Sequence, residues 1–279
     1  MSENSNKNSG IRVVFLMIMI LLTTSFLMFF IIGKFNSTPA KGANQERKNN
    51  QSIMSQSKEI ENTKPQREKR ADGKPVGKVV YLTFDDGPST LTGKFLDVLK
   101  ENDVKATFFM QGSNLQNASY QENVKRAVKE GHYIGAHSMT HNSDKLYKNG
   151  KFVPEMKETL SLIKDITGTN PKLVRPPYGS APGLKSEEVR NQIVEAGIKV
   201  WDWTIDSYDW KLKNNPNEIV ENVKKSTTED VEVVLMHEKP QTLAMLSEII
   251  KFYKDKGYEF GVYNDADHFH LNFQKDHRL

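Results

Sequence analysis

Charged and apolar residues are distributed so unevenly that the chain divides into three stretches. Residues 13–32 contain no charged side chain and are almost wholly apolar. A helix of this length spans roughly 30 Å, the thickness of the hydrocarbon core of a membrane. We therefore predict a transmembrane anchor over residues 13–33, preceded by a cytoplasmic N-terminus at residues 1–12. A cleaved signal peptide is the alternative, although its apolar region usually has only about 7–15 residues.

The basic residues around this apolar block leave its orientation open. Lys7 and Arg12 precede the block, whereas four basic residues follow it within residues 34–48. Cytoplasmic flanks usually carry the excess of Lys and Arg, so the local pattern argues against a cytoplasmic N-terminus. We still predict that orientation, because the candidate chemistry of the folded part points to a substrate outside the cell.

Residues 34–75 are rich in Asn, Gln, Ser, Lys and Glu and nearly free of apolar side chains. Such a segment cannot bury enough surface to fold, so we predict a disordered tether. It carries ten Lys or Arg against five Asp or Glu, a balance of +5 in a chain whose total is +4. Since the residues before the tether add +1, those after it sum to −2. The folded part therefore lacks the basic surface that nucleic-acid binding requires.

Beyond residue 76, short apolar runs alternate with segments of helical periodicity. The apolar runs predict strands at residues 79–84, 106–110, 133–136, 173–174, 198–203, 231–236 and 258–262. The intervening segments predict helices at residues 94–100, 123–129, 156–166, 187–196, 219–225 and 243–253. This alternation is typical of a parallel sheet with helical crossovers.

The expected fold class is α/β, and residues 76–270 are expected to form one domain. We predict a distorted (β/α) barrel of about seven parallel strands, preceded by the N-terminal transmembrane helix. An open doubly wound sheet is the alternative. Residues 271–279 are predicted to be a C-terminal tail. In either architecture, catalytic residues are expected at the carboxyl ends of the strands.

Candidate metal ligands follow two of the predicted strands. Asp85 and Asp86 stand side by side at the end of the first strand, and such a pair requires a compensating positive charge. His137 and His141 follow the third strand at a spacing that places both on one face of a helical turn. Two imidazoles and a carboxylate form a three-ligand metal site with an open position. The alternatives are a solvated Asp-Gly turn and histidines that serve only packing.

Three further strand ends carry polar residues. Arg175 begins an Arg-Pro-Pro-Tyr-Gly turn and is a candidate to neutralise the acidic pair. Asp209 and Trp210 follow the strand at residues 198–203, and His237 ends an apolar strand. A histidine in such a run requires a polar partner, and a neighbouring carboxylate would raise its pKa. The alternatives are a structural loop and a hydrogen-bonded core histidine.

Taken together, these five motifs resemble those of the polysaccharide deacetylases of carbohydrate esterase family 4, the NodB-homology domain. The resemblance covers about residues 76–265, and every motif occurs in order without a substitution at its core positions. It implies that Asp86, His137 and His141 bind one divalent metal ion. It implies further that Asp85 is the general base, which Arg175 orients and keeps ionised.

The same resemblance assigns the opposite side of the site. His237 is similar to the general acid of the family, and Asp209 to the carboxylate that tunes it. The backbone N–H of Tyr178 is similar to the donor that stabilises the oxyanion. Trp210 and Leu235 are similar to the walls of the acetyl pocket.

The implied activity is metal-dependent removal of acetyl groups from N-acetylglucosamine residues of peptidoglycan, outside a bacterial cell membrane. Zinc is the expected ion, and cobalt, nickel and manganese accept the same ligands. The alternatives are a deacetylase of chitin-like or other acetylated polysaccharides, including acetylxylan, or an inactive wall-binding module. A second metal site at Asp265, Asp267, His268 and His270 is a weaker hypothesis. The chain has no cysteine, which excludes disulfides and thiolate metal ligands.

Overall fold

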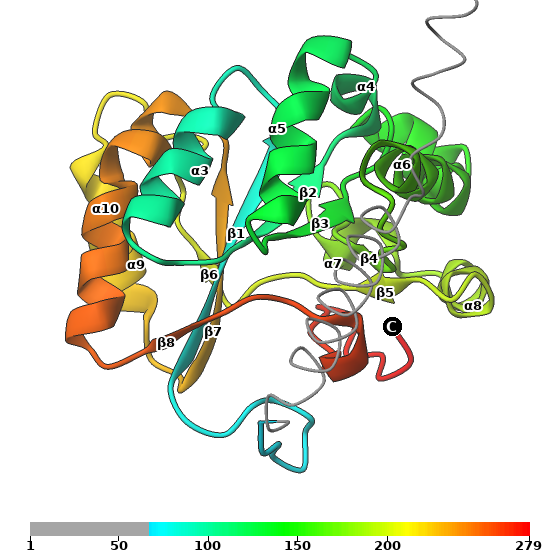
Figure 1. Ribbon diagram of the computed structural model, residues 1–279. Helices are drawn as coiled ribbons and strands as arrows, with labels where there is room; N and C mark the ends of the chain where they lie inside the picture. The colour runs from blue at the N-terminus through cyan, green and yellow to red at the C-terminus, as the bar shows by residue number, and fades with distance from the viewer. Residues whose placement is uncertain (1–66) are drawn as a thin grey trace, which may run out of the picture. The chain divides into compact units, whose positions relative to one another are not determined.

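The computed structural model describes residues 67–279. The predicted cytoplasmic N-terminus, the anchor at residues 13–33 and the tether up to residue 66 lie outside this range. Among the residues that are described, no helix combines the length and the apolar character that a membrane span requires. Figure 1 shows these residues as a central sheet with helices packed around it.

The sheet of residues 67–279 has eight strands, and all their pairings are parallel. The strands are β1 (Val79–Gly87), β2 (Thr107–Met110), β3 (Tyr133–Ala136), β4 (Leu173–Val174), β5 (Lys199–Val200), β6 (Ile205–Asp206), β7 (Val231–His237) and β8 (Glu259–Gly261). Their order is β5-β4-β3-β2-β1-β7-β6. β8 pairs with the first half of β1, at the edge where β2 pairs with its second half.

The sheet has to curl, because its two outermost strands are neighbours in the sequence. Val200 ends β5 and Ile205 begins β6, so the connection can span at most about 18 Å. A flat sheet with this strand order would place β5 and β6 roughly 29 Å apart. The result is a curled half-barrel, which agrees with the predicted (β/α) barrel in class. The strand predicted at residues 198–203 is present only as the short strand β5, and β6, which begins beyond that range, was not predicted.

Helices connect the strands and cover the outside of the sheet (Figure 1). They are α3 (Thr92–Glu101), α4 (Gly112–Leu115), α5 (Ala118–Lys129), α6 (Phe152–Thr167), α7 (Ser180–Gly183), α8 (Glu187–Glu195), α9 (Asn217–Ser226) and α10 (Pro240–Asp255), with a π-helical turn, η1 (Asp144–Lys148), and a 3-10 turn, η2 (Asp265–Asp267). Each of the six predicted helices is present and generally longer than predicted. The short helices α4 and α7 were not predicted, since one turn leaves no hydrophobic period to detect.

The core lies between the sheet and these helices. β1 is the central strand, and Val80, Leu82 and Phe84 are fully buried in it. Phe84 packs edge-on against Phe95 of α3, with ring centroids 5.0 Å apart. Truncating such a buried aromatic side chain typically costs about 3–5 kcal/mol of stability. This packing holds the carboxyl end of β1 in place.

Both ends of the described range are ordered. Lys69 and Pro75 form an antiparallel bridge, and the amide of Val76 donates to the carbonyl of Glu68. This turn lies within the range predicted as tether. In the predicted tail, Leu271 pairs with Trp201 and Leu279 is fully buried. Backbone bonds within the first segment and its ion pairs with distant residues hold it in place, and the second segment pairs with Trp201; hydrophobic patterning alone reveals neither.

Candidate active site

A bulge at the end of β1 places the two adjacent carboxylates. The pairing of β1 with β2 shifts register between Asp85 and Gly87, and Asp86 has a φ of 68°. Successive side chains of a regular strand point to opposite faces, whereas an extra residue re-aims one of them. Both carboxylates therefore line the same cavity. Asp85 is buried and Asp86 is partly exposed.

The two histidines lie on a loop after β3, and the predicted helical turn is wrong. Ser138 and His141 have φ values of 64° and 52°, which lie outside the right-handed helical region. The amide of His141 donates to the hydroxyl of Ser138 over 2.9 Å, and the amide of Gly112 donates to the carbonyl of Ser138. These bonds keep the loop folded back, so His137 and His141 still share one side.

The loop brings His137 and His141 to Asp86. Asp86 Oδ1 lies 3.7 Å from His137 Nε2 and 3.6 Å from His141 Nε2. Two ligands of a tetrahedral zinc ion lie roughly 3.4 Å apart. Among residues 67–279, this trio is the group of His, Asp and Glu side chains whose ligand atoms are close enough to hold a metal ion. The donor set therefore fits a divalent cation.

The protonation of these groups suits ligation. His137 Nδ1 donates to the backbone carbonyl of Arg175 over 2.8 Å, which leaves the Nε2 lone pair for a metal ion. Burial lowers the pKa of His137 and favours the neutral imidazole. Burial raises the pKa of Asp86, but nearby groups led by His137 outweigh that effect, so the net shift is downward. A charged carboxylate and a neutral imidazole are the forms that bind metals.

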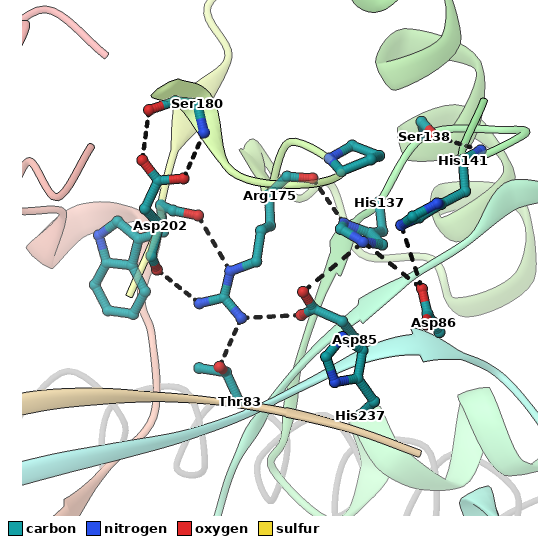
Figure 2. A network of polar contacts seen from close by, with 12 residues as sticks. Thr83, Asp85, Asp86, His137, Ser138, His141, Arg175, Ser180, Asp202 and His237 are labelled. Atoms are coloured by element: carbon teal, nitrogen blue, oxygen red, sulfur yellow. Dashed lines mark hydrogen bonds and ion pairs between the residues drawn. The ribbon is translucent and has the colours of Figure 1, made fainter. Parts of the chain in front are cut away.

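Arg175 stands behind Asp85 and is fully buried. Its Nη1 donates to Asp85 Oδ1 over 2.9 Å and to Thr83 Oγ1 over 2.6 Å. Its Nε and Nη2 donate to the carbonyls of Trp201 and Asp202. Figure 2 shows the guanidinium between Asp85 and Asp202. Arg175 therefore contacts Asp85, one of the two acidic residues that it was expected to neutralise. It lies on the side of Asp85 that faces away from the cavity.

A second pair, His237 and Asp209, lies beside the first, because β7 pairs with β1 and brings His237 next to Asp85. His237 Nδ1 donates to Asp209 Oδ1 over 2.7 Å, and the amide of His237 donates to Asp209 Oδ2. Thr242 Oγ1 also donates to Asp209 Oδ2, over 2.5 Å. Burial lowers the pKa of His237, but the hydrogen bond and charge of Asp209 outweigh it, so the net shift is upward. The structure thus brings together the two residues that the sequence analysis expected to form a pair.

The Arg-Pro-Pro-Tyr-Gly segment forms a tight turn at the rim of the cavity. The amide of Gly179 donates to the carbonyl of Pro176 over 2.9 Å, and Tyr178 has a φ of 66°. These features match a type II turn, in which Pro precedes a position that usually requires Gly or Asn. Within residues 67–279, the Tyr178 amide donates to no protein group. It is therefore available to an oxyanion.

The candidate residues enclose one cavity of about 430 Å³. Eight of the ten predicted residues line it: Asp85, Asp86, His137, His141, Tyr178, Trp210, Leu235 and His237. Arg175 and Asp209 support it from behind. The second cluster does not converge on a metal site, because both ring nitrogens of His268 have partners in Tyr263 and Leu279.

Comparison with known proteins places this geometry in a family. Residues 72–201 match the family model described as polysaccharide deacetylase. The chain is 52% identical over 208 residues to a peptidoglycan-N-acetylglucosamine deacetylase of Bacillus cereus, a match that covers 72% of this chain and 75% of that protein. The chain belongs to the polysaccharide deacetylase family. The deacetylase is also 45% identical to a putative polysaccharide deacetylase, YheN, of Bacillus subtilis, over 68% of each chain.

A solved structure agrees with this assignment. The crystal structure of a Bacillus cereus polysaccharide deacetylase superimposes with a TM-score of 0.70 at 51% identity. The match covers 72% of this chain and 100% of that one. This deacetylase is therefore a hydrolase that removes acetyl groups from a polysaccharide.

The structure of the deacetylase adds residues that the motifs did not single out. Trp203, Asp206 and Lys239 also line the cavity, and Lys239 Nζ lies 4.0 Å from Asp86 Oδ2. Asp202 is fully buried between Trp201 and Trp203. In the sequence, Asp202 stands between two tryptophans at the end of an apolar run, and this position could have indicated a buried carboxylate. Lys239 carried no such signal, since an isolated lysine after a strand is ordinarily solvated.

Proposed function

We propose that this deacetylase hydrolyses the N-acetyl group of N-acetylglucosamine residues in peptidoglycan and releases acetate. The observation that carries the proposal is the position of the metal-ligand trio beside two candidate proton-transfer groups, each of which has its own charged partner. Asp85 lies on the side of Arg175, whereas His237 lies on the side of Asp209. The substrate is taken from the printed function of the Bacillus cereus relative.

The trio of Asp86, His137 and His141 would hold one divalent ion. We propose zinc, with cobalt, nickel and manganese as ions that accept the same nitrogen and oxygen donors. A bound ion would polarise the acetyl carbonyl and make the attacking water more acidic. The remaining chemistry is assigned to the protein's own side chains.

Asp85 acts as the general base in this proposal. Arg175 Nη1 donates a hydrogen bond to Asp85 Oδ1. The other oxygen, Asp85 Oδ2, lies 3.8 Å from His137 Nε2, on the side of the ligand trio. The hydrogen bond from Arg175 fixes Oδ1 and leaves Oδ2 as the oxygen that takes a proton from water. As the water attacks the carbonyl, the Tyr178 amide donates to the developing oxyanion. One such donor is typically worth about 10²–10³ in rate.

His237 acts as the general acid. An amine leaves readily only when it is protonated, so the bond between carbon and nitrogen requires a proton donor. Asp209 holds the Nδ1 proton, which leaves Nε2 as the nitrogen that gives a proton to the leaving amine. Base and acid must hold opposite protonation states at one pH. Asp209 supports the protonated form of His237, and Arg175 gives Asp85 a separate partner.

The substrate assignment is tested with purified wall fragments. Zinc-reconstituted protein is incubated with peptidoglycan, and muramidase fragments are analysed by mass spectrometry. Loss of acetyl from N-acetylglucosamine supports the proposal, whereas loss only from N-acetylmuramic acid would overturn it. Parallel reactions with chitin oligomers and acetylxylan test the other polysaccharide substrates. Glycan binding without acetate release would identify a wall-binding module.

We also propose that residues 13–33 anchor the deacetylase in a bacterial cell membrane, with its catalytic domain outside. The support is the uncharged apolar block in the sequence and an extracellular substrate class. Protease treatment of protoplasts expressing the full chain should digest the domain. The undigested chain should remain with salt-washed membranes. A shortened chain in the medium would instead indicate a cleaved signal peptide.

A further inference from the structure

A network behind the active site ties both ends of the Tyr178 turn to one residue, Asp202. Before the turn, Arg175 Nη2 donates to the backbone carbonyl of Asp202 over 2.8 Å. After the turn, the amide of Ser180 donates to Asp202 Oδ1 over 2.8 Å, and the Ser180 hydroxyl donates to Oδ2 over 2.5 Å. Figure 2 shows Asp202 between Arg175 and Ser180. The turn therefore begins and ends on a single buried support.

The same carboxylate also binds the C-terminal segment. The amide of Phe273 donates to Asp202 Oδ2 over 2.7 Å, and the amide of Asp202 donates to the carbonyl of Leu271. The ring of Phe273 packs edge-on against Trp203, with centroids 5.0 Å apart. A Cβ atom at Gly179 would lie 3.0 Å from both of these rings. The C-terminal segment thus packs directly against the turn.

Keeping a carboxylate in this position is unfavourable unless donors surround it. Asp202 is fully buried, and burial raises its pKa; the donors of Ser180 and Phe273 oppose that rise, but the net shift of the pKa is upward. Two amides and a hydroxyl aim at the carboxyl group, and its two oxygens accept all three hydrogen bonds. An apolar core position would need no such arrangement. The geometry therefore indicates that the carboxylate has a purpose beyond packing.

That purpose concerns the backbone amide at the rim of the cavity. Tyr178 holds a φ of 66°, which costs a non-glycine residue about 1–2 kcal/mol. Strained backbone persists only where the surroundings enforce it. The surroundings here are Arg175 and Ser180, both of which are held by Asp202. We propose that Asp202 is a positioning residue that fixes the Tyr178 amide where the oxyanion forms, an inference that rests on the proposed deacetylase mechanism.

The Asp202→Asn substitution tests the proposal directly. Asparagine has a single acceptor oxygen, so its NH₂ group would face either the Ser180 amide or the Phe273 amide. A displaced oxyanion donor weakens an interaction made only in the transition state. We expect kcat for an N-acetylglucosamine pentamer to fall at least about tenfold, while KM stays within about twofold. An unchanged kcat overturns the positioning role.

Asp276→Asn is the matched control. Asp276 anchors the same C-terminal segment through Arg190, at 2.9 Å, and has no contact with the turn. Both variants should lower the melting temperature, but Asp276→Asn should keep kcat within about twofold of wild type. If kcat falls equally in both, loosening of the segment explains the loss. That result also overturns the proposal.

A milder substitution tests the same network in case Asp202→Asn does not fold. Ser180→Ala removes the hydroxyl bond to Asp202 and leaves the two amide bonds in place. We expect kcat to fall several-fold at unchanged KM, less than in Asp202→Asn. If Asp202→Asn does not fold, an unchanged kcat in Ser180→Ala overturns the proposal. The zinc-reconstituted wild type is assayed alongside. If it releases no acetate, the proposed function is overturned. If it is active and the variants keep its kcat, the positioning role alone is overturned.

Discussion

Nδ1 of His237 lies 2.7 Å from Oδ1 of Asp209, and this contact sets the protonation of the proposed general acid. Because the net pKa shift of His237 is upward, the imidazolium persists to higher pH than in a free histidine. The stability that the pair contributes is present below the unfolded pKa and is lost as pH rises through the folded pKa. In the proposed mechanism, the same protonation governs catalysis.

Replacing Asp209 with Asn should move the basic limb of the rate profile to lower pH. Asparagine keeps an acceptor for His237 Nδ1–H but removes the negative charge that raises the pKa. The pH dependence of kcat/KM, measured by acetate release, reports the pKa values of the free enzyme. The acidic limb should stay in place. A basic limb at its wild-type position would contradict the assignment of His237 as the general acid.

Replacing Asp85 with Asn should lower kcat by about 10²–10⁴, because the general base is removed. Asparagine still accepts from Arg175, so the fold and glycan binding should be preserved. Glycan affinity is measured by calorimetry and turnover by acetate release. Asp97→Asn is the control, since Asp97 lies on the outer surface of α3 and pairs with Arg126. A fully active Asp85→Asn variant would exclude this residue as the base.

Replacing Arg175 with Lys should destabilise the protein although the charge is kept. Arg175 donates to four acceptors, and an ammonium group cannot match that planar fork. We expect the free energy of unfolding to fall by about 3 kcal/mol in urea titrations. Arg126→Lys, on the surface of α5, should cost less than about 1 kcal/mol. Equal losses in the two variants would show that the buried network contributes little.

Replacing Tyr178 with Gly should retain most of the activity. Glycine adopts the positive φ of this position without strain and keeps the backbone N–H. The variant loses the ring contact with His141, at 4.8 Å between centroids, so a modest rise in KM is expected. Steady-state kinetics should show kcat within about tenfold of wild type. A loss as large as that of Asp85→Asn would indicate that the phenol itself acts in the reaction.

Strand periodicity and strand-end polarity were sufficient to predict an α/β fold with parallel strands and the charged residues at the strand ends, whereas Tyr178, Trp210 and Leu235 were assigned to the site through the family resemblance. The buried run of β1 and the alternation with helices are local properties, so a single sequence displays them. The short strand β6 was missed, because the break between β5 and β6 is set by sheet closure. The loop of His137 and His141 was misread as helical, because left-handed residues such as Ser138 leave no hydrophobic signature.

The supporting residues behind the site depend on contacts between distant segments. Asp202 joins residues 175, 180 and 273, and no local pattern links those positions. Lys239 approaches Asp86 only because β7 pairs with β1. The ordered turn at residues 67–75 and the packed segment at residues 271–279 depend in the same way on partners far along the chain.

The most direct test of the account is a metal titration of the chelated protein. Acetate release from N-acetylglucosamine oligomers should be absent without metal, rise in proportion to added zinc, and level off at one ion per chain. His137→Ala should show neither tight binding nor activity. Full activity in the chelated wild type, or in His137→Ala, would contradict a single ion held by Asp86, His137 and His141 as the centre of catalysis.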